Sequence, residues 1–269
     1  MSDVLAVGVI GAGVIGQSHI QAIEESKNVR LVAVMDIDAG RAERAGGEHG
    51  AKAYMSVDAL LEDRAVQAVH VCSPHNQHAD QVTAAAQSGK HVLVEKPMAL
   101  TLPDCDRMIA ACRRAGTVLM VGQVLRHFPV NLKIRELITD GTIGNVGHLM
   151  RRRHSYFDTT RPQSSYGSWY LDLDVGGICV LYCFGPHEYD ILHWYVSSPV
   201  VRVYSQGTES TELYRGQKDS YTSLMTHANG AVSVLSQSVV CRVGGYDQTI
   251  VGSHGSIATT NGKLILNEE

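Results

Sequence analysis

The stretch Val7-Gly8-Val9-Ile10-Gly11-Ala12-Gly13-Val14-Ile15-Gly16 decides the fold of this 269-residue chain. An apolar run ends at Gly11, and the glycines at 11, 13 and 16 have the spacing of a turn between a strand and a helix that binds a dinucleotide. Gly11 permits the tight turn, Gly13 lets the backbone approach a pyrophosphate, and Gly16 lets the helix pack against the strand. Amides at the helix N-terminus favour the phosphates. The stretch therefore predicts a dinucleotide site.

Short apolar runs alternate with helix-like segments through the first 125 residues. The runs are rich in valine and poor in charge, which is typical of strands covered on both faces of a parallel sheet. Repeated strand–helix units predict an α/β fold, a doubly wound Rossmann sheet, for residues 1–125. The expected strands are 4–10, 31–35, 68–72, 91–94 and 118–121, and the expected helices are 15–26, 39–49, 57–62, 76–88 and 102–115.

A different pattern begins at about residue 126, where strand-like alternation and turn signals predominate. This pattern predicts an α+β domain over 126–269, with a large, mostly antiparallel open sheet. We expect Pro186 to disturb the helix that contains it, because proline lacks an amide hydrogen. The expected helices are 130–139 and one between 177 and 196, and the expected strands are 146–154, 200–207, 220–227, 231–240, 247–251 and 263–266.

Asp36 stands at the end of the second expected strand, where a carboxylate accepts hydrogen bonds from ribose hydroxyls. It also repels a 2′-phosphate, and neither Ile37 nor Asp38, which follow, supplies a positive charge. The sequence therefore favours NAD over NADP. The alternative, a tight turn with a solvated acid, leaves the agreement between glycines, strand and acid unexplained.

Composition points away from several classes of partner. The formal net charge is -4, which gives no general attraction to nucleic acid or anionic lipid, and no apolar run reaches the 18 residues of a membrane span. Six cysteines form no CxxC pair, which favours reduced thiols. We expect a cytoplasmic protein that acts on a small molecule, with no nucleic-acid or membrane partner.

Three further segments carry a family resemblance. They are Ser73-Pro74-His75-Asn76-Gln77-His78, then Gly89-Lys90-His91-Val92-Leu93-Val94-Glu95-Lys96-Pro97, and Gly185-Pro186-His187-Glu188-Tyr189-Asp190. Together with the glycine loop and the segment 122–129, they resemble the glucose-fructose oxidoreductase and inositol dehydrogenase family, known as Gfo/Idh/MocA. The resemblance extends over nearly the whole chain.

The resemblance implies an NAD-dependent oxidoreductase that moves hydride between nicotinamide and a secondary alcohol or ketone of a sugar, cyclitol or related ring. It implies that Lys96 polarises the reacting oxygen and that His187 exchanges its proton, roles that suit an ammonium group and an imidazole. It also implies a homodimer or homotetramer formed through the open sheet. Cofactor contacts are expected from Gly11, Gly13, Val14, Ile15, Gly16, Asp36, Ile37, Cys72, Ser73, Pro74, His75, His78, Glu95, Lys96 and Gln123.

Cys183 departs from the family pattern, which usually has an aspartate one helical turn before His187. A neutral thiol gives an imidazolium no anionic support, so we expect reduced or differently organised activity. Cys179, Cys183 and His187 are spaced along about 12 Å of helix, too far to close on one tetrahedral metal ion. No metal site is expected.

Substrate contacts are expected from polar and aromatic side chains that suit a polyhydroxylated ring: His154, Tyr156, Trp169, Asp172 and Tyr246. We expect Arg151, Arg152 and Arg153 to form a solvated strand face or to meet an anionic substituent. The sequence ends soon after an expected strand, so the second domain is expected to be short at its C-terminus. Two other functions stay open, an NAD-binding sensor without turnover and a hydrolase or lyase that retains NAD.

Overall fold

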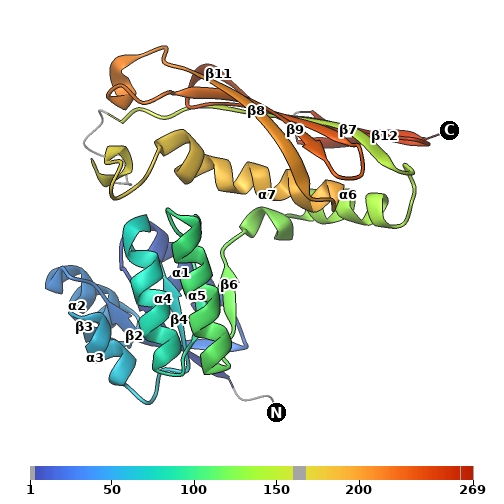
Figure 1. Cartoon of the computed structure of the whole chain (residues 1–269). Coiled ribbons are helices and arrows are strands. Elements are labelled where there is room, and N and C mark those ends of the chain that lie inside the picture. The colour runs from blue at the N-terminus through green and yellow to red at the C-terminus, as the bar shows by residue number, and fades with distance from the viewer. Residues whose placement is uncertain (1–3, 160–167, 261, 269) are drawn as a thin grey trace. The chain divides into compact units, whose positions relative to one another are not determined.

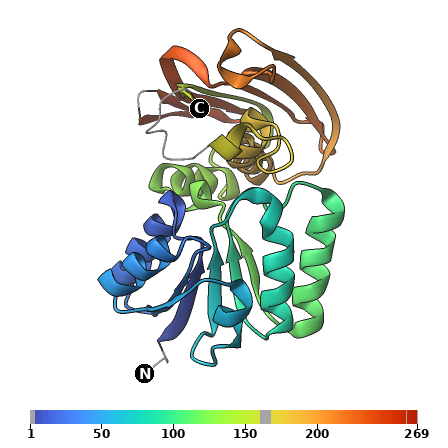
Figure 2. The ribbon, with the colours of Figure 1, turned by 90° about the vertical axis from the view of Figure 1, so that its left-hand side faces the viewer.

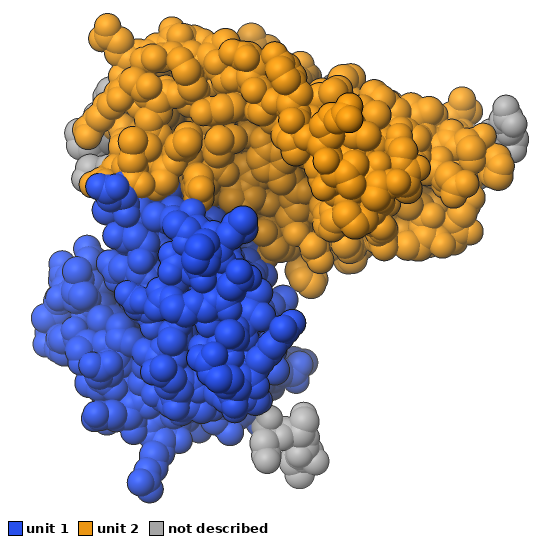
Figure 3. Space-filling model, viewed as in Figure 1, with its two compact units in different colours: residues 1–122, 165–169, 174–176 blue, residues 123–164, 170–173, 177–269 orange. Residues whose placement is uncertain are grey.

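The computed structural model describes residues 4–159, 168–260 and 262–268, which fall into two compact units. Unit 1 comprises residues 1–122, 165–169 and 174–176, and unit 2 comprises residues 123–164, 170–173 and 177–269 (Figure 3). Unit 1 thus contains two short segments from later in the sequence besides its first 122 residues. No described helix is long and apolar enough to cross a membrane.

Unit 1 contains a six-stranded parallel sheet. Its strands lie in the order β3-β2-β1-β4-β5-β6, so the connections reverse between β1 and β4, where sheets of this kind bind ligands. The predicted α/β Rossmann fold is confirmed, although the sequence did not indicate β3. The strands are β1 (Leu5–Ile10), β2 (Val29–Met35), β3 (Lys52–Tyr54), β4 (Ala68–Val71), β5 (His91–Val94) and β6 (Leu119–Val121).

Helices cover both faces of this sheet (Figure 2). Ile20 and Ile23 of α1 pack on β1 on one face, and Val82 of α4 and Met108 of α5 belong to the core on the other. Burial on both faces explains why the strands are valine-rich rather than alternating. The helices are α1 (Val14–Glu25), α2 (Ala39–Glu48), α3 (Val57–Glu62), α4 (His78–Gln87) and α5 (Leu102–Ala115).

Unit 2 contains a seven-stranded sheet in the order β13-β12-β11-β7-β10-β9-β8. Only β7 and β10 pair in parallel among its described strands, so the predicted mostly antiparallel sheet is confirmed. The register of β11 shifts between Val240 and Gly245, near Gly244. This irregularity interrupts the alternation of side chains, so the sequence pattern predicted only residues 247–251 of the longer strand β11. The strands are β7 (Val146–Tyr156), β8 (Val200–Thr208), β9 (Ser220–His227), β10 (Val232–Ser238), β11 (Val240–Gly252), β12 (Gly255–Thr260) and β13 (Lys263–Glu268).

Two helices, α6 (Pro129–Thr139) and α7 (Gly185–Val196), lie along one face of this second sheet (Figure 1). Ile134 of α6 and Ile191 of α7 belong to the same buried core as Leu149 and Leu235, which lie on β7 and β10. Since side chains alternate along a strand, the neighbours of those core residues point to the opposite, open face.

A single π-helical turn, Val180–Phe184, leads into α7. The amide of Gly185 bonds to the carbonyl of Val180, five residues back. The helical segment is continuous from Cys179 to Val196, so Pro186 lies inside it, at the point where the π-helical turn passes into α7. The wider turn directly before Pro186 is consistent with the expected disturbance, because proline cannot donate an amide hydrogen bond there. Turns of this kind are frequent at functional sites.

Candidate functional site

The glycine loop of unit 1 has the form that a pyrophosphate requires. Gly11 adopts a φ of 93°, and a Cβ atom there would lie 2.9 Å from the carbonyl oxygen of Cys72. A Cβ on Gly16 would meet the Gly11 carbonyl oxygen at 1.9 Å, whereas one on Gly13 would have no atom within 4 Å. Gly13 caps α1 without a side-chain hydrogen bond, which leaves the first amides of α1 for an anion.

Asp36 follows β2 and is buried, with three hydrogen bonds to its carboxylate. Oδ2 accepts from the amide of Ala12 at 2.9 Å, and Oδ1 accepts from the amide of Asp38 and from Nη2 of Arg41, each also at 2.9 Å. Burial by itself raises the pKa of Asp36, but these hydrogen bonds, led by that from Arg41, outweigh it and lower the pKa. Asp36 is thus held as a carboxylate beside the glycine loop.

Lys96 comes two residues after β5, and a polar network anchors the residue before it. The Glu95 carboxylate accepts from Nε2 of His19 at 2.9 Å and from the amide of Lys96 at 3.0 Å. Nδ1 of His19 lies 3.0 Å from Nδ1 of His70. Burial lowers the pKa of His70 to about 4, so His70 is neutral near pH 7. Burial raises the pKa of Glu95, but His19 and Lys96 outweigh it and lower the pKa.

His78 anchors the residue after Lys96. Its ring is fully buried, with Nδ1 2.9 Å from the carbonyl oxygen of Pro97 and Nε2 2.9 Å from that of Ser73. Both nitrogens therefore contact backbone, and the ring supports these two loops instead of reaching a ligand as expected. The backbone around Lys96 is fixed on both sides, by Glu95 and by His78.

The remaining expected cofactor positions of unit 1 differ in accessibility. Ile37 is 78% exposed and Val14 is 43% exposed. Both apolar side chains are therefore accessible to a ligand. His75 is buried, with Nδ1 2.8 Å from the carbonyl oxygen of Gly176, and the Trp169 ring packs edge-on against it. The described part of the chain thus offers Ile37 and Val14 to a ligand more readily than it offers His75.

In unit 2, His187 lies in the first turn of α7 and is partly buried. Cys183 is buried in the π-helical turn before it. Asp190, the last residue of the GxHxxD segment, accepts two hydrogen bonds from Arg126, at 2.7 Å from Nε and 2.6 Å from Nη2. This paired contact ties α7 to the segment that follows β6, Val124–His127.

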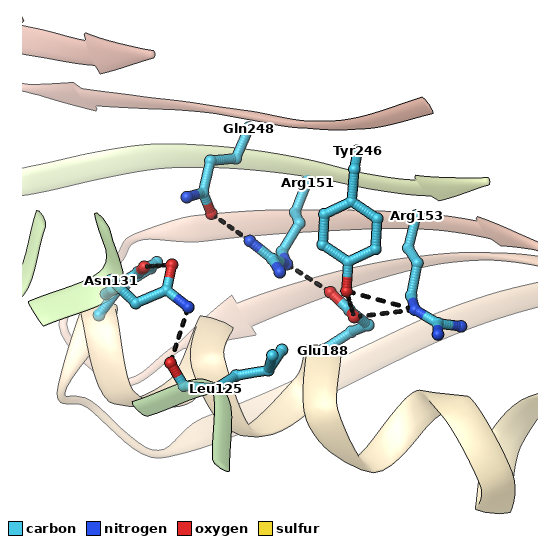
Figure 4. A network of polar contacts seen from close by, with 8 residues as sticks. Leu125, Asn131, Arg151, Arg153, Glu188, Tyr246 and Gln248 are labelled. Atoms are coloured by element: carbon cyan, nitrogen blue, oxygen red, sulfur yellow. Dashed lines mark hydrogen bonds and ion pairs between the residues drawn. The ribbon is translucent and has the colours of Figure 1, made fainter. Parts of the chain in front are cut away.

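Glu188, next to His187, lies in a buried polar network between α7 and the sheet (Figure 4). Its Oε2 accepts from Nε of Arg151, and its Oε1 accepts from the hydroxyl of Tyr246 and lies 3.2 Å from Nε of Arg153. The expectation of a solvated arginine face is wrong for Arg151, because its side chain is 4% exposed and faces α7. Successive residues of a helix lie about 100° apart, so fixing Glu188 also fixes the direction of His187.

The three expected substrate contacts on the second sheet lie on both of its faces. Tyr246 points toward α7, whereas His154 bonds through Nε2 to the Ser236 hydroxyl on the open face of the sheet. Tyr156, two residues further along β7, lies on the same open face as His154. Trp169 belongs to unit 1 and Asp172 to unit 2. Of the three candidates on the sheet, Tyr246 alone faces the helix that carries His187.

Sequence reasoning missed Arg41, His19 and Glu188. The signal for Arg41 was its place one turn into the helix after Asp36, with Asp38 as the cap. The signal for Glu188 was that a carboxylate stands next to His187, on the face of a helix whose other buried side chains are mostly apolar. Within the described ranges, no group of three or more His, Cys, Asp or Glu residues is arranged to hold a metal ion.

Comparison with known proteins covers both units. Residues 5–123 match the model of an oxidoreductase family with an NAD-binding Rossmann fold, and residues 131–258 match the GFO/IDH/MocA C-terminal domain. An uncharacterized oxidoreductase of Bacillus subtilis, YrbE, is 30% identical over 98% of this chain and 76% of its own length. Myo-inositol 2-dehydrogenase of Thermotoga maritima is 32% identical over 96% of this chain and 75% of its own length.

Solved structures agree in fold with both units. An oxidoreductase domain protein from Kribbella flavida superposes with a TM-score of 0.88 at 27% identity, over all of this chain and 80% of that one. An NAD-binding oxidoreductase from Klebsiella pneumoniae gives 0.88 at 25% identity, over 99% of this chain and 76% of that one. The chain therefore belongs to the GFO/IDH/MocA family of NAD-binding oxidoreductases.

Proposed function

We propose that this oxidoreductase transfers hydride between NAD and a secondary alcohol or ketone of a sugar, cyclitol or related ring. The observation that carries the proposal is the fixed backbone on both sides of Lys96, since Glu95 contacts the partly buried His19 and Pro97 contacts the buried His78. A side chain that must meet a reacting oxygen gains from such preorganisation. The relative from Thermotoga maritima, named myo-inositol 2-dehydrogenase, supports the substrate class.

The residues of unit 1 fit a dinucleotide. The open space at Gly13 and the uncapped start of α1 would take the pyrophosphate, and Asp36 would take the adenosine ribose. The nicotinamide, when bound, accepts or supplies the hydride. We prefer NAD to NADP because Asp36 is held as a carboxylate.

The roles of the protein side chains follow from their chemistry. Lys96 would donate a hydrogen bond to the reacting oxygen and stabilise the charge that develops on it. His187 would take the hydroxyl proton during oxidation and return it during reduction. Tyr246 would contact the ring of the substrate. Cys183 is a neutral thiol and would give an imidazolium at His187 no anionic support.

An assay with a panel of cyclitols, sugars and sugar acids tests this function. With NAD present, we expect the absorbance of reduced nicotinamide to rise with at least one ring alcohol of the panel. Tight NAD binding without reduction by any member would support the sensor instead. A substrate that is cleaved or dehydrated while NAD stays bound would support the hydrolase or lyase. Either of these two outcomes would contradict a net hydride transfer.

We also propose that the chain forms a homodimer or homotetramer through the open face of its second sheet. The supporting observation is a continuous cross-strand row, largely apolar, on the face away from α6 and α7. Met150 and Tyr204 in this row are 51% and 66% exposed, and a contiguous exposed apolar patch is typical of an interaction surface. The row runs through Tyr204, Leu224, Val234, Met150, Thr249, Ala258 and Ile265.

Leu224→Arg is expected to convert the oligomer to monomers, because it places a charge within this row, where a second copy would bury it. Light scattering after size-exclusion chromatography measures the mass. Val118→Arg, at an exposed position of unit 1, serves as the control and should leave the mass unchanged. A wild-type monomer, or a Leu224→Arg variant that keeps the wild-type mass, would exclude this interface.

A further inference from the structure

We propose that Arg153 selects ring substrates that carry a carboxylate, by donating hydrogen bonds to that group beside His187. The inference deepens the function proposed above and rests on it, because it starts from a ring bound at His187. The observation behind it is an excess of positive charge in the network of Figure 4. Arg151 and Arg153 both belong to this network, and Glu188 is the one acid that either of them contacts among the described residues.

Two guanidinium groups and one carboxylate leave one positive charge of this network without a counter-charge. The side chains of Arg151 and Arg153 are 4% and 16% exposed, and that of Glu188 is fully buried. A charge that is removed from water is costly unless an opposite charge compensates it. An anion bound at this point would supply the missing charge. A carboxylate carries a single negative charge and would therefore balance the network, whereas a phosphate dianion would exceed the balance.

Arg153 has the free donors that such a ligand needs. Its Nε is used within the protein, since it lies 3.2 Å from Oε1 of Glu188 and 3.3 Å from the hydroxyl of Tyr246. Its two terminal nitrogens point away from Glu188 (Figure 4) and have no hydrogen-bond partner in the part of the chain that the structure describes. These nitrogens form one edge of a planar guanidinium, which can bind a carboxylate through two parallel hydrogen bonds. Arg151 is less suited, because it already donates to Glu188 and Gln248.

The contacts of Arg153 with the helical segment of unit 2 place these donors near His187. The guanidinium carbon lies 4.6 Å from the centre of the Phe184 ring, and Nε contacts Glu188. Residues three and four apart on a helix are neighbours on its surface, so Phe184 is next to both His187 and Glu188. A ring whose hydroxyl meets His187 can therefore direct a carboxylate substituent toward Arg153.

Matched ring compounds test the inference by binding, without the need for turnover. D-glucuronate and D-glucuronamide have the same ring and nearly the same shape but differ in charge, as do quinate and its amide. Glucose 6-phosphate adds a phosphate to a similar ring. Dissociation constants for the complete chain, measured by saturation-transfer NMR in the presence of NADH, give the comparison. We expect at least one acid to bind about tenfold or more tightly than its amide.

Variants of two neighbouring arginines assign this preference to one side chain. Arg153→Met is expected to weaken binding of the acid about tenfold or more and binding of the amide by less than about threefold. Arg153→Lys keeps the charge but loses the paired geometry, and should retain part of the preference. Arg152→Met removes the same charge from the opposite face of β7, where Arg152 pairs with Asp247, and should change neither affinity.

The outcomes separate this inference from the proposed function. Equal affinities for acid and amide, no binding of any acid, or equal losses for both in Arg153→Met would overturn the inference. Tighter binding of glucose 6-phosphate than of either acid would overturn it as well, because the site would then be one for phosphate. Hydride transfer from neutral rings without a preference for acids would support the proposed function and overturn the inference. A preference for acids that depends on Arg153, in a protein that reduces NAD with no ring, would support the inference and contradict the proposed function.

Discussion

Lys96→Met is expected to lower kcat/KM for the ring substrate by about 10²- to 10³-fold, while NADH binding changes little. Methionine matches the length of the lysine stem but cannot donate to the reacting oxygen, and removal of one preorganised donor costs about that much in catalysis. The fixed backbone at Glu95 and Pro97 should keep the local structure intact in the variant. Initial rates with the best substrate of the panel give the measurement.

A matched control comes from another lysine of unit 1. Lys27→Met alters an exposed side chain beyond the end of α1 and should leave kcat/KM unchanged. Activity that persists in Lys96→Met would remove Lys96 from the chemistry. Parallel loss of NADH affinity would assign the lysine to cofactor binding instead of to the reacting oxygen.

Arg151→Met is expected to lower the free energy of unfolding by about 3–5 kcal/mol, the usual cost of leaving one member of a buried ion pair without its partner. Glu188 is fully buried, so its carboxylate cannot turn to water when the guanidinium is removed. Arg153 and Tyr246 remain near Oε1, but Oε2 loses its donor. Urea unfolding at neutral pH measures the change.

Two further variants separate burial from charge. Arg152→Met removes the neighbouring arginine, whose contact with Asp247 is between partly exposed side chains, and should cost less than about 1 kcal/mol. Glu188→Gln combined with Arg151→Met removes the buried charge and should recover part of the loss. Equal effects of Arg151→Met and Arg152→Met would contradict a buried network that holds α7.

Local signals made much of unit 1 predictable. The glycine spacing, the apolar strands around it and Asp36 each depend on neighbours close in the chain, and the structure has the turn, the sheet and the buried carboxylate where they were expected. Two expected ligand contacts, His75 and His78, proved to be buried against backbone carbonyls. A histidine beside a binding loop has the same local sequence whether it faces a ligand or supports the loop.

The network of unit 2 could not be read from the sequence because its partners are distant in the chain. Arg151 meets Gln248, 97 residues away, only because β7 lies between β11 and β10 in the sheet. The position of β7 in the sheet depends in turn on its parallel pairing with β10. The alternation of apolar and polar residues along a strand does not indicate which strand pairs with it or in which direction. Three consecutive arginines looked solvated, although alternation correctly placed Arg152 on the face opposite Arg151 and Arg153.

The central claim is net hydride transfer between a ring carbon and the nicotinamide. Incubation of the protein with NAD and a ring alcohol of the panel that is deuterated at its carbinol carbons, followed by mass spectrometry of the dinucleotide, tests it most directly. The account predicts reduced dinucleotide that carries one deuterium, together with the ketone. Dinucleotide that stays oxidised and free of deuterium, whether or not the ring alcohol is consumed, would contradict it.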